Sequence, residues 1–353
     1  MERLQNMELK KNIIVHDAQN EEIIPFQNGV NHTAAVPFEL VQRRENIRFN
    51  LHRNGKVGDL RRVINYFKGG FSLFLHRNRF ANIICWQQFY GLTFGFFCNL
   101  FHVRSSCRII VCNYTYKKKQ GLIGKIYLRF MKKCLAGGVI DYIHILSPKY
   151  ADRVCCELGF DRSRVITAPF GIPDEMSRYA SLETPAGFNK NGYFLAIGRS
   201  NRDYDFLLEV WKGIDYPLVI ISDVYLKKTD NPNVVIRNDI GADEQYGWIS
   251  SCRANILCLD DGNIASGDTV LLTAMSLSKI NIVSRPSTLA EMYIEDQVNA
   301  IAVDKNEDDF RKTVTAVIEG RFDYIIPQAR ESFLSCFSRE SMGKRIGEYV
   351  KGE

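Results

Sequence analysis

The run Phe194-Leu195-Ala196-Ile197-Gly198 places four apolar residues directly before a glycine. Leu218–Ser222 (LVIIS) and Asn12–Val15 (NIIV) have the same character. A strand that is buried on both faces reads as a continuous apolar run, and such strands belong to parallel sheets that helices cover. These runs therefore predict an α/β fold with parallel strands.

Short apolar runs of this kind alternate with helical stretches in two successive series. The expected strands are 12–16, 36–42, 81–86, 108–113, 142–147 and 164–169 in the first half, and 193–198, 217–222, 233–237, 255–259, 281–284 and 300–303 in the second. Two such series predict two doubly wound, Rossmann-like domains. The length of 353 residues agrees, because it exceeds one ordinary domain and suits two of about 170.

The domain boundaries follow from composition and periodicity. We expect an N-terminal domain over 1–172, a linker over 173–191, a second domain over 192–328 and a C-terminal helix over 329–353. Pro173, Pro185 and the lack of a sustained period mark the linker. In the tail, apolar positions from Phe333 to Val350 are spaced for one face of a helix over 327–350.

The segment 80–103 contains no Asp, Glu, Lys or Arg, and its 24 residues are long enough to span a bilayer. Gln87 and Gln88 argue against a span, because polar groups are costly in lipid. We interpret the segment instead as a buried strand over 81–86, a polar turn and a buried helix over 90–101.

Charge is divided unequally along the chain. Residues 1–170 carry 26 basic and 12 acidic side chains, a net charge of +14, whereas residues 171–353 carry 20 and 28, a net of −8. A basic half attracts polyanions such as phospholipid, nucleic acid or a phosphorylated acceptor, although a solvated basic surface is the simpler explanation. The expected helix over 121–135 has an apolar and a basic stripe beside Lys117-Lys118-Lys119; an ordinary surface helix and a membrane-surface helix both fit it.

Several kinds of site are not predicted. The six histidines have no metal-ligand spacing with cysteine, so we expect no structural metal. Asp260-Asp261 and Asp203-Tyr204-Asp205 resemble chelating acids, but Asp205 as the N-cap of a helix over 206–211 is the better interpretation. Arg3, Lys10 and Lys11 interrupt any early apolar run, so we expect no secretory signal and reduced, mostly buried cysteines in the cytoplasm.

The first candidate binding segment follows the strand at 193–198. Gly198 lets the chain turn at the carboxyl end of that strand, where ligands bind on open α/β sheets. Arg199 and Arg202 place two cations there, and a guanidinium holds a diphosphate with paired hydrogen bonds. An ordinary pair of surface arginines is the alternative.

The second candidate segment is Ser266-Gly267-Asp268-Thr269-Val270, followed by Thr273. It predicts a glycine turn into the N-terminus of a helix. Free backbone N–H groups and the positive end of the helix dipole bind phosphate, and the hydroxyls of Ser266 and Thr269 would add contacts. A plain helix capped by Asp268 or Ser266 is the alternative.

These segments resemble the donor half of GT-B glycosyltransferases of the large retaining family four. Gly198-Arg199 matches that family's Gly-Arg, and Ser266–Asp304 resembles its glycine-rich loop, helix and following strand. In addition, 147–172 resembles the last strand and hinge of the family's first domain, and Phe337–Glu340 resembles the start of its closing helix. The resemblance covers roughly 80–350 and implies two Rossmann-like domains that face a cleft, with a C-terminal helix crossing back to the first domain.

The chain departs from the family in its Glu-x7-Glu motif. By register the two glutamates fall on Ala265 and Thr273. The family's second glutamate binds the ribose, for which Thr273 offers one hydroxyl, and Asp268 is the candidate to replace the first. Arg202 stands in for the family's lysine. The family's first-domain histidine is also absent.

The resemblance implies a glycosyltransferase that takes its sugar from a UDP or GDP type of nucleotide-diphosphate sugar, with retention and without a divalent metal or other cofactor. Arg199 and Arg202 would stabilise the leaving diphosphate, with Gly198, Ser266, Gly267, Asp268, Thr269, Val270 and Thr273 around the donor and Ile240 near the base. An inverting enzyme would need a base in the first domain, with Asp17 or His16 as candidates. Capping of the first strand's end is the simpler role for both.

The basic half would recognise the acceptor, a glycan or a polyprenyl-diphosphate-linked glycan of surface polysaccharide such as lipopolysaccharide or capsule. We expect a cytoplasmic protein that attaches peripherally to the inner face of the cytoplasmic membrane. Four aromatic residues of this half either stack on sugars or pack in the core: Trp86, Tyr90, Tyr114 and Tyr116.

The rival hypotheses are a catalytically weak partner subunit of the GT-B type, a sugar-nucleotide epimerase and a nucleic-acid binder. We expect no nucleic-acid partner.

Overall fold

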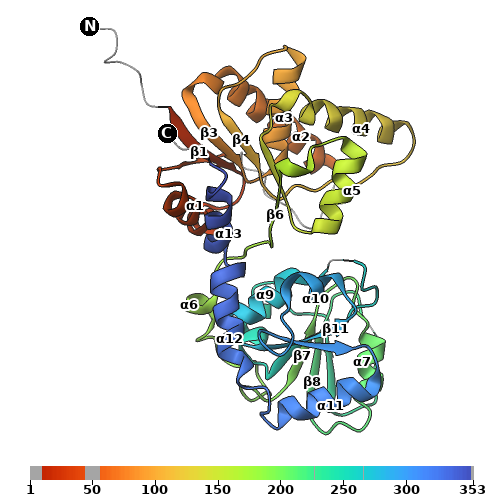
Figure 1. Cartoon of the computed structure of the whole chain (residues 1–353). Coiled ribbons are helices and arrows are strands. Elements are labelled where there is room, and N and C mark those ends of the chain that lie inside the picture. Colours follow the sequence, from red (N-terminus) through yellow and green to blue (C-terminus); the bar gives the residue numbers. More distant parts are fainter. Residues whose placement is uncertain (1–9, 44–55, 226, 265, 351–353) are drawn as a thin grey trace. The chain divides into compact units, whose positions relative to one another are not determined.

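The computed structural model describes residues 10–43, 56–225, 227–264 and 266–350, and the chain divides into two compact units. Unit 1 comprises the chain up to Phe170 together with the segment from Arg339 onward, and unit 2 comprises Gly171–Ser338. Each unit contains a parallel six-stranded sheet with helices against it (Figure 1). The predicted α/β fold with two Rossmann-like domains is therefore confirmed.

The sheet of unit 1 has the order β2-β1-β3-β4-β5-β6, with every pair parallel. Its strands are β1 (Lys11–His16), β2 (Glu39–Gln42), β3 (Phe80–Cys85), β4 (Arg108–Val111), β5 (Tyr142–Ile145) and β6 (Val165–Thr167). Its longer helices are α1 (Asn20–Ala34), α2 (Lys56–Leu75), α3 (Gln88–Leu100), α4 (Gly121–Leu135), α5 (Pro148–Leu158) and α13 (Arg339–Gly347).

Alternate strand residues of unit 1 face two separate cores, because side chains in a strand point to opposite faces in turn. Ile14, Ile84 and Ile110 pack with α1 and α13 on one face. Ile13 and Ile83 belong to the opposite core, with residues of α2, α3, α4 and α5. Figure 1 shows α1 and α13 beside each other, away from α2 to α5. Helices on both faces explain why the strands are apolar on both sides.

The C-terminal helix α13 belongs to unit 1 because it packs closely on α1. A Cβ on Gly29 of α1 would lie 2.1 Å from the carbonyl oxygen of Glu340, and one on Gly343 of α13 would lie 2.1 Å from that of Phe26. A glycine on each helix thus lets the two backbones touch. Arg339 fixes the start of α13, since its guanidinium donates to the carbonyl of Glu22 at 2.9 Å.

The tail differs from the expected single helix over 327–350. It contains α12 (Ile325–Ser332), a π-helical turn (Phe333–Phe337) and α13. Ser338 interrupts the helices with extended backbone (φ −73°, ψ 156°) and forms a parallel bridge with Ile172. This pairing, which joins residues far apart in the sequence, takes precedence over the local helical period.

The sheet of unit 2 has the order β12-β11-β10-β7-β8-β9 and is also parallel throughout. Its strands are β7 (Phe194–Ile197), β8 (Leu218–Ile221), β9 (Val234–Arg237), β10 (Ala254–Leu257), β11 (Ile280–Arg285) and β12 (Ile301–Asp304). Its other helices are α6 (Met176–Tyr179), α7 (Tyr204–Val210), α8 (Gln245–Ser251), α9 (Asp268–Ser276), α10 (Thr288–Tyr293) and α11 (Glu307–Ile318). The strands of both units coincide with the twelve expected runs to within a few residues at each end.

The expected linker contains a short helix, and the expected strand and helix of 80–103 are both present. Residues 173–191, expected as a linker, include α6, whose Tyr179 stacks on Tyr246 with ring centroids 4.0 Å apart. Residues 80–103 form β3 and α3, with Gln87 as the N-cap that accepts from the N–H of Phe89. Within the described residues, no helix has the length and apolar character needed to cross a membrane.

Candidate functional site in unit 2

The candidate site lies where the strand order of the second sheet reverses. β7 lies between β8, which follows it in sequence, and β10, so the chain leaves the middle of the sheet in both directions. Ligands of doubly wound folds bind outside the carboxyl ends of the strands at such a point. Gly198 follows β7 and the segment that leads into α9 follows β10, so the two segments singled out in the sequence meet here.

Arg202 joins the two segments through two glycines. A Cβ on Gly198 would lie 2.9 Å from Nη2 of Arg202, and one on Gly267 would lie 2.8 Å from the same atom. Both glycines also have positive φ, +145° and +99°. The guanidinium therefore occupies the space that a Cβ at these positions would enter, and the positive φ values favour glycine at both.

The remaining atoms of the Arg202 guanidinium are held by the protein. Its Nε donates to the carbonyl of Ile197 at 3.2 Å, and its Nη1 donates to the carbonyl of Ser200 at 3.1 Å and to Oγ of Ser266 at 3.3 Å. Burial lowers the pKa of the guanidinium, while Tyr204 and Asp268 oppose this effect. Among the described residues, no carboxylate forms an ion pair with Arg202 and no group accepts from Nη2. A partly buried cation that is not ion-paired favours an anionic ligand.

The N-terminus of α9 lies beside this cation. Gly267 is the N-cap and provides no capping side chain, so backbone N–H groups of the first turn point outward. The Asp268 carboxylate accepts from the N–H of Thr269 at 2.9 Å, so the predicted acid at this end is a local cap as well as a candidate ligand group. Thr269 is exposed, and Ser266 lies against Arg202.

Arg199 differs from Arg202 in being free to move. Its side chain is 73% exposed and its Nε pairs with Asp223 at 2.9 Å. An exposed ion pair of this kind contributes at most about 1 kcal/mol, so the guanidinium can leave Asp223 for a phosphate at little cost. Asp223 follows β8, and the sequence gives no local sign that it faces Arg199.

Two further residues at this edge position the site and were not predicted. The amide of Asn201 donates to the carbonyl of Asp261 at 2.9 Å and accepts from the N–H of Asp261 at 2.8 Å, which ties the β7 loop to the β10 loop. Lys305, after β12, pairs with Asp203 at 2.6 Å and donates to the carbonyl of Leu259 at 2.8 Å. The φ of +55° at Asn201, typical of Asn in tight turns, is the kind of feature that sequence could have indicated.

The other residues predicted to bind the sugar nucleotide either face the core of unit 2 or lie outside the described residues. Ile240 and Val270 are half-buried and pack against the same core cluster. Thr273 is 3% exposed, on the face of α9 that contains buried residues. Ala265, the position of the family's first glutamate, lies outside the described residues.

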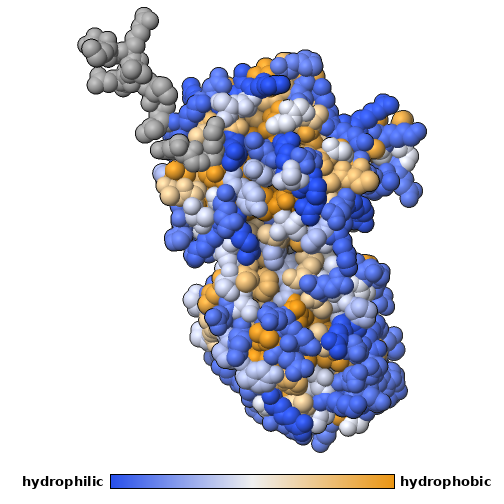
Figure 2. All heavy atoms as spheres, viewed as in Figure 1, coloured by the Kyte–Doolittle hydropathy of each residue, from blue (hydrophilic) through white to orange (hydrophobic). Residues whose placement is uncertain are grey.

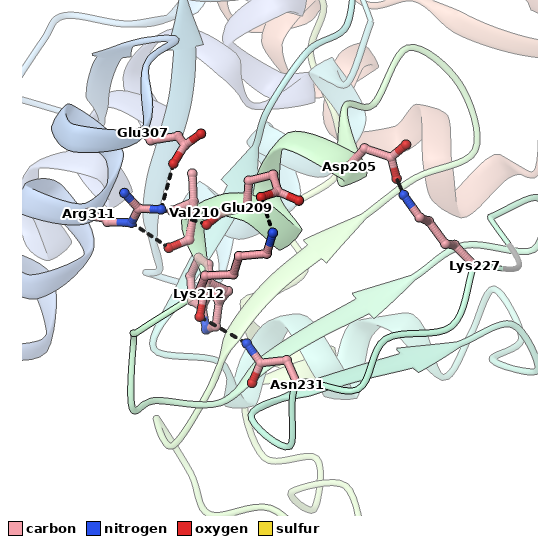
Figure 3. Close-up of polar contacts among 9 residues, drawn as sticks. Asp205, Glu209, Val210, Lys212, Lys227, Asn231, Glu307 and Arg311 are labelled. Carbon is pink, nitrogen blue, oxygen red and sulfur yellow. Dashed lines mark hydrogen bonds and ion pairs between the residues drawn. The ribbon is translucent and has the colours of Figure 1, made fainter.

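The paired acids have other partners. Asp203, and not Asp205 as expected, caps α7 by accepting from the N–H of Phe206 at 3.0 Å, because α7 begins two residues earlier than predicted. Asp205 instead pairs with Lys227 at 3.0 Å (Figure 3). Figure 3 also shows Arg311 of α11 donating to the carbonyls of Glu209 and Val210 at the C-terminal end of α7. The described residues contain no group of three or more His, Cys, Asp or Glu side chains placed to hold a metal.

Unit 1 contains the predicted candidate bases at the end of β1. Asp17 lies 3.8 Å from Nη2 of Arg62 and keeps about a quarter of its side chain exposed. His16 is fully buried, its Nδ1 lies 3.2 Å from the carbonyl oxygen of Ala18, and burial lowers its pKa. Burial also raises the pKa of Tyr66 nearby. Of these two candidate bases, only Asp17 has a side chain that reaches solvent.

The aromatic residues proposed to stack on sugars lie in the core. Trp86, Tyr90, Tyr114 and Tyr116 are between 1% and 9% exposed. Trp86, for example, packs edge-on against Phe26 with ring centroids 5.0 Å apart. The sugar-stacking role is therefore wrong and the core-packing alternative holds, because all four residues belong to the two core clusters of unit 1.

Two parallel six-stranded Rossmann-like units, with the last helix of the chain packed on the first unit, define the GT-B fold. The chain is similar to a solved glycosyltransferase from Rickettsia africae ESF-5, with a TM-score of 0.60, 12% identity and coverage of 97% of this chain and 98% of that one. It is similar to Anabaena HepE in complex with UDP and glucose (TM-score 0.59, 12% identity, 96% and 98% covered) and to WaaG, a glycosyltransferase involved in lipopolysaccharide biosynthesis (0.54, 13%, 97% and 100%). No protein-family model and no curated protein matches the chain.

Proposed function

We propose that the chain is a glycosyltransferase that moves a sugar from a nucleotide-diphosphate sugar to a glycan or polyprenyl-diphosphate-linked acceptor. One observation carries the donor half of the proposal: the guanidinium of Arg202 lies between Gly198 and Gly267 at the reversal of the strand order, without a carboxylate partner among the described residues. The GT-B fold and the UDP-glucose complex of HepE support a diphosphate donor of the UDP type.

In this mechanism the two arginines have different tasks. Arg202 is held by Ile197 and Ser266, and it would receive a phosphate oxygen only on its Nη2 side. Arg199 would leave Asp223 and close over the diphosphate from the exposed side. Together with the N–H groups at the start of α9, they would stabilise the charge that develops on the leaving diphosphate.

The stereochemistry and the acceptor remain part of the proposal. Retention needs no protein base if the diphosphate takes the acceptor proton, and the resemblance to family four favours it. Asp17 would serve as the base of an inverting reaction. The lipopolysaccharide role of WaaG supports a surface polysaccharide, and we place the reaction at the inner face of the cytoplasmic membrane, without a divalent metal.

The test is a thermal-shift screen with UDP, GDP, ADP, CMP and their sugars in EDTA. We expect one diphosphate to stabilise the wild type and to lose most of that effect in Arg199→Ala. Arg321→Ala is the matched control, because Arg321 is an exposed arginine of the same unit that pairs with Glu319. Asp223→Asn should bind at least as tightly as the wild type, since it releases Arg199 and removes a negative charge.

The second candidate is a catalytically weak GT-B partner subunit, which the loss of the Glu-x7-Glu motif favours. Transfer or slow hydrolysis of the stabilising sugar nucleotide supports the enzyme. Binding of a nucleotide with neither reaction, in the presence of candidate acceptors, supports the partner subunit. If no nucleotide shifts the wild type, the donor site proposed here is refuted.

A further inference from the structure

The first turns of α4 expose three large aliphatic side chains. Leu122, Ile123 and Ile126 are 74%, 71% and 59% exposed, and their spacing places them on one side of the helix. The sequence predicts one apolar stripe along this helix, formed by Leu122, Ile126, Phe130 and Cys134. In the structure that stripe divides, because Cys134 is buried in the core of unit 1 while the aliphatic residues of the first turns point to solvent.

Lysine and arginine residues flank these aliphatic residues in the sequence. Residues 117–133 contain seven basic residues and no acid. A Cβ on Gly124 would lie 2.1 Å from the carbonyl oxygen of Lys119, so the lysine-rich loop packs directly against the start of the helix. The ammonium of Lys119 lies 4.6 Å from the ring centroid of Tyr127. We call Lys117–Ile126 the α4 tip. Figure 2 shows mainly hydrophilic residues, with apolar ones among them, on this side of unit 1.

We infer that the α4 tip is a membrane-docking site whose occupant is an anionic phospholipid bilayer. Aliphatic side chains would enter the acyl boundary, and the surrounding cations would meet the phosphate headgroups. The segment 117–133 has seven cations and no acid of its own, and among the described residues only Lys118 of these pairs with an acid, Glu157, at 3.2 Å. The remaining positive charge is complementary to such a surface and argues against a neutral protein partner.

A single-stranded nucleic acid is less suited to the same charge. Sequence-tolerant binding of single strands uses exposed aromatic rings as stacking platforms. The two tyrosines that accompany the lysine run, Tyr114 and Tyr116, are 1% and 7% exposed. The large apolar residues that remain exposed at the tip are aliphatic, which suits acyl chains and not bases.

The position of the α4 tip indicates what membrane docking would do for the proposed reaction. α4 follows β4 through the loop 112–120, so its first turn lies at the carboxyl edge of the sheet of unit 1, the edge at which Asp17 also lies. A chain that docks through the tip would hold this edge at the lipid surface, where the head of a polyprenyl-linked acceptor lies. This use rests on the proposed function, whereas the docking itself does not.

The test is flotation of the full chain with vesicles of equal parts phosphatidylglycerol and phosphatidylcholine, without any nucleotide. We expect binding at low salt, little binding to pure phosphatidylcholine, and weakening as salt rises. Replacing Leu122, Ile123 and Ile126 together by glutamine should weaken binding roughly tenfold or more. Replacing Lys117, Lys119 and Lys125 by glutamine should cost about fivefold for each lysine.

The matched control is a second exposed apolar cluster of unit 1. Leu75, Leu100 and Phe101, at the ends of α2 and α3, are 57%, 47% and 53% exposed. The triple glutamine variant of this cluster should bind vesicles like the wild type. Every residue replaced is exposed, and circular dichroism checks that each variant is folded.

Three results would overturn the inference: no binding to the anionic vesicles, equal binding by the tip variant, or greater loss in the control cluster. Tight oligonucleotide binding that survives the aliphatic substitutions at physiological salt would assign the charge to nucleic acid and would also overturn it. A chain that floats with vesicles but shows no shift with any nucleotide would refute the proposed donor site and leave the docking site standing.

Discussion

The contact between Arg202 and Gly267 can be measured by comparing two glycines of unit 2. Gly213 has a φ of +91° and no atom within 4 Å of a built Cβ, whereas Gly267 has a φ of +99° and Nη2 of Arg202 at 2.8 Å. Gly213→Ala should therefore report the cost of the backbone conformation alone, about 1–2 kcal/mol of unfolding free energy. Gly267→Ala should lower the free energy of unfolding by this amount and by a further amount.

The further cost comes from the hydrogen bonds of the guanidinium. Arg202 can move away from a new methyl group only by leaving acceptors such as the carbonyls of Ile197 and Ser200. Losing one hydrogen bond to a charged group costs about 1.5–3 kcal/mol. In an Arg202→Ala background this part disappears, so the double-mutant cycle should give a coupling energy of about 1.5–3 kcal/mol between positions 202 and 267.

The assay is equilibrium unfolding in urea, followed by tryptophan fluorescence. Because the chain has two units, the signal must come from one of them. Trp211 and Trp248 lie in unit 2 and Trp86 in unit 1, so a Trp86→Phe background restricts the signal to unit 2. Equal costs for the two alanine variants, or a coupling below about 0.5 kcal/mol, would refute the contact and with it the enclosed cation of the proposed donor site.

Two further predictions concern unit 1. His144 is fully buried, its Nδ1 accepts from the N–H of Asn113 at 3.3 Å and its Nε2 donates to the carbonyl of Ala168 at 3.0 Å, and burial lowers its pKa to about 4. Below about pH 6.5 this histidine takes up a proton in the unfolded chain but not in the folded chain. The unfolding free energy of the wild type should therefore fall by about 3 kcal/mol relative to that of His144→Gln as the pH drops from 6.5 to 4. Urea unfolding across that range measures the difference, and a constant difference would contradict the prediction. Gly343→Ala places a methyl group against the carbonyl of Phe26 and pushes α1 and α13 apart. This should lower the free energy of unfolding by about 1–3 kcal/mol, as followed by Trp86 fluorescence. Lys344→Ala, which removes a half-exposed side chain paired with Glu340, is the control, and equal stability of the two variants would contradict the close helix contact.

The strands could be predicted because their determinants are local. Runs such as Phe194–Ile197 are apolar at every position since helices cover both faces of the sheet, and this pattern needs no knowledge of neighbours. The break at Ser338 could not be predicted in the same way. The apolar period continues through it, and its extended backbone is set by a bridge to Ile172, which is far away in the sequence.

The candidate site was predictable only in part for the same reason. The glycine turn at Gly198 and the helix start at Gly267 have local signatures. That Arg202 lies between them depends on the strand order, which places β10 beside β7. Asp223 and Lys305 follow two other strands, so no spacing in the sequence relates them to the site.

The resemblance to family four and the enclosed arginine can be considered together under the proposed function. By the register of that resemblance, Ala265 and Thr273 stand where the family has glutamates, so the sequence has no acid at either position. In the proposed donor site, uncharged residues at both positions would favour a diphosphate and would remove acceptors for ribose and sugar hydroxyls. Because phosphate binding depends on charge and hydroxyl recognition depends on placed acceptors, we expect the chain to keep diphosphate affinity and to differ from the family in which nucleoside and sugar it selects.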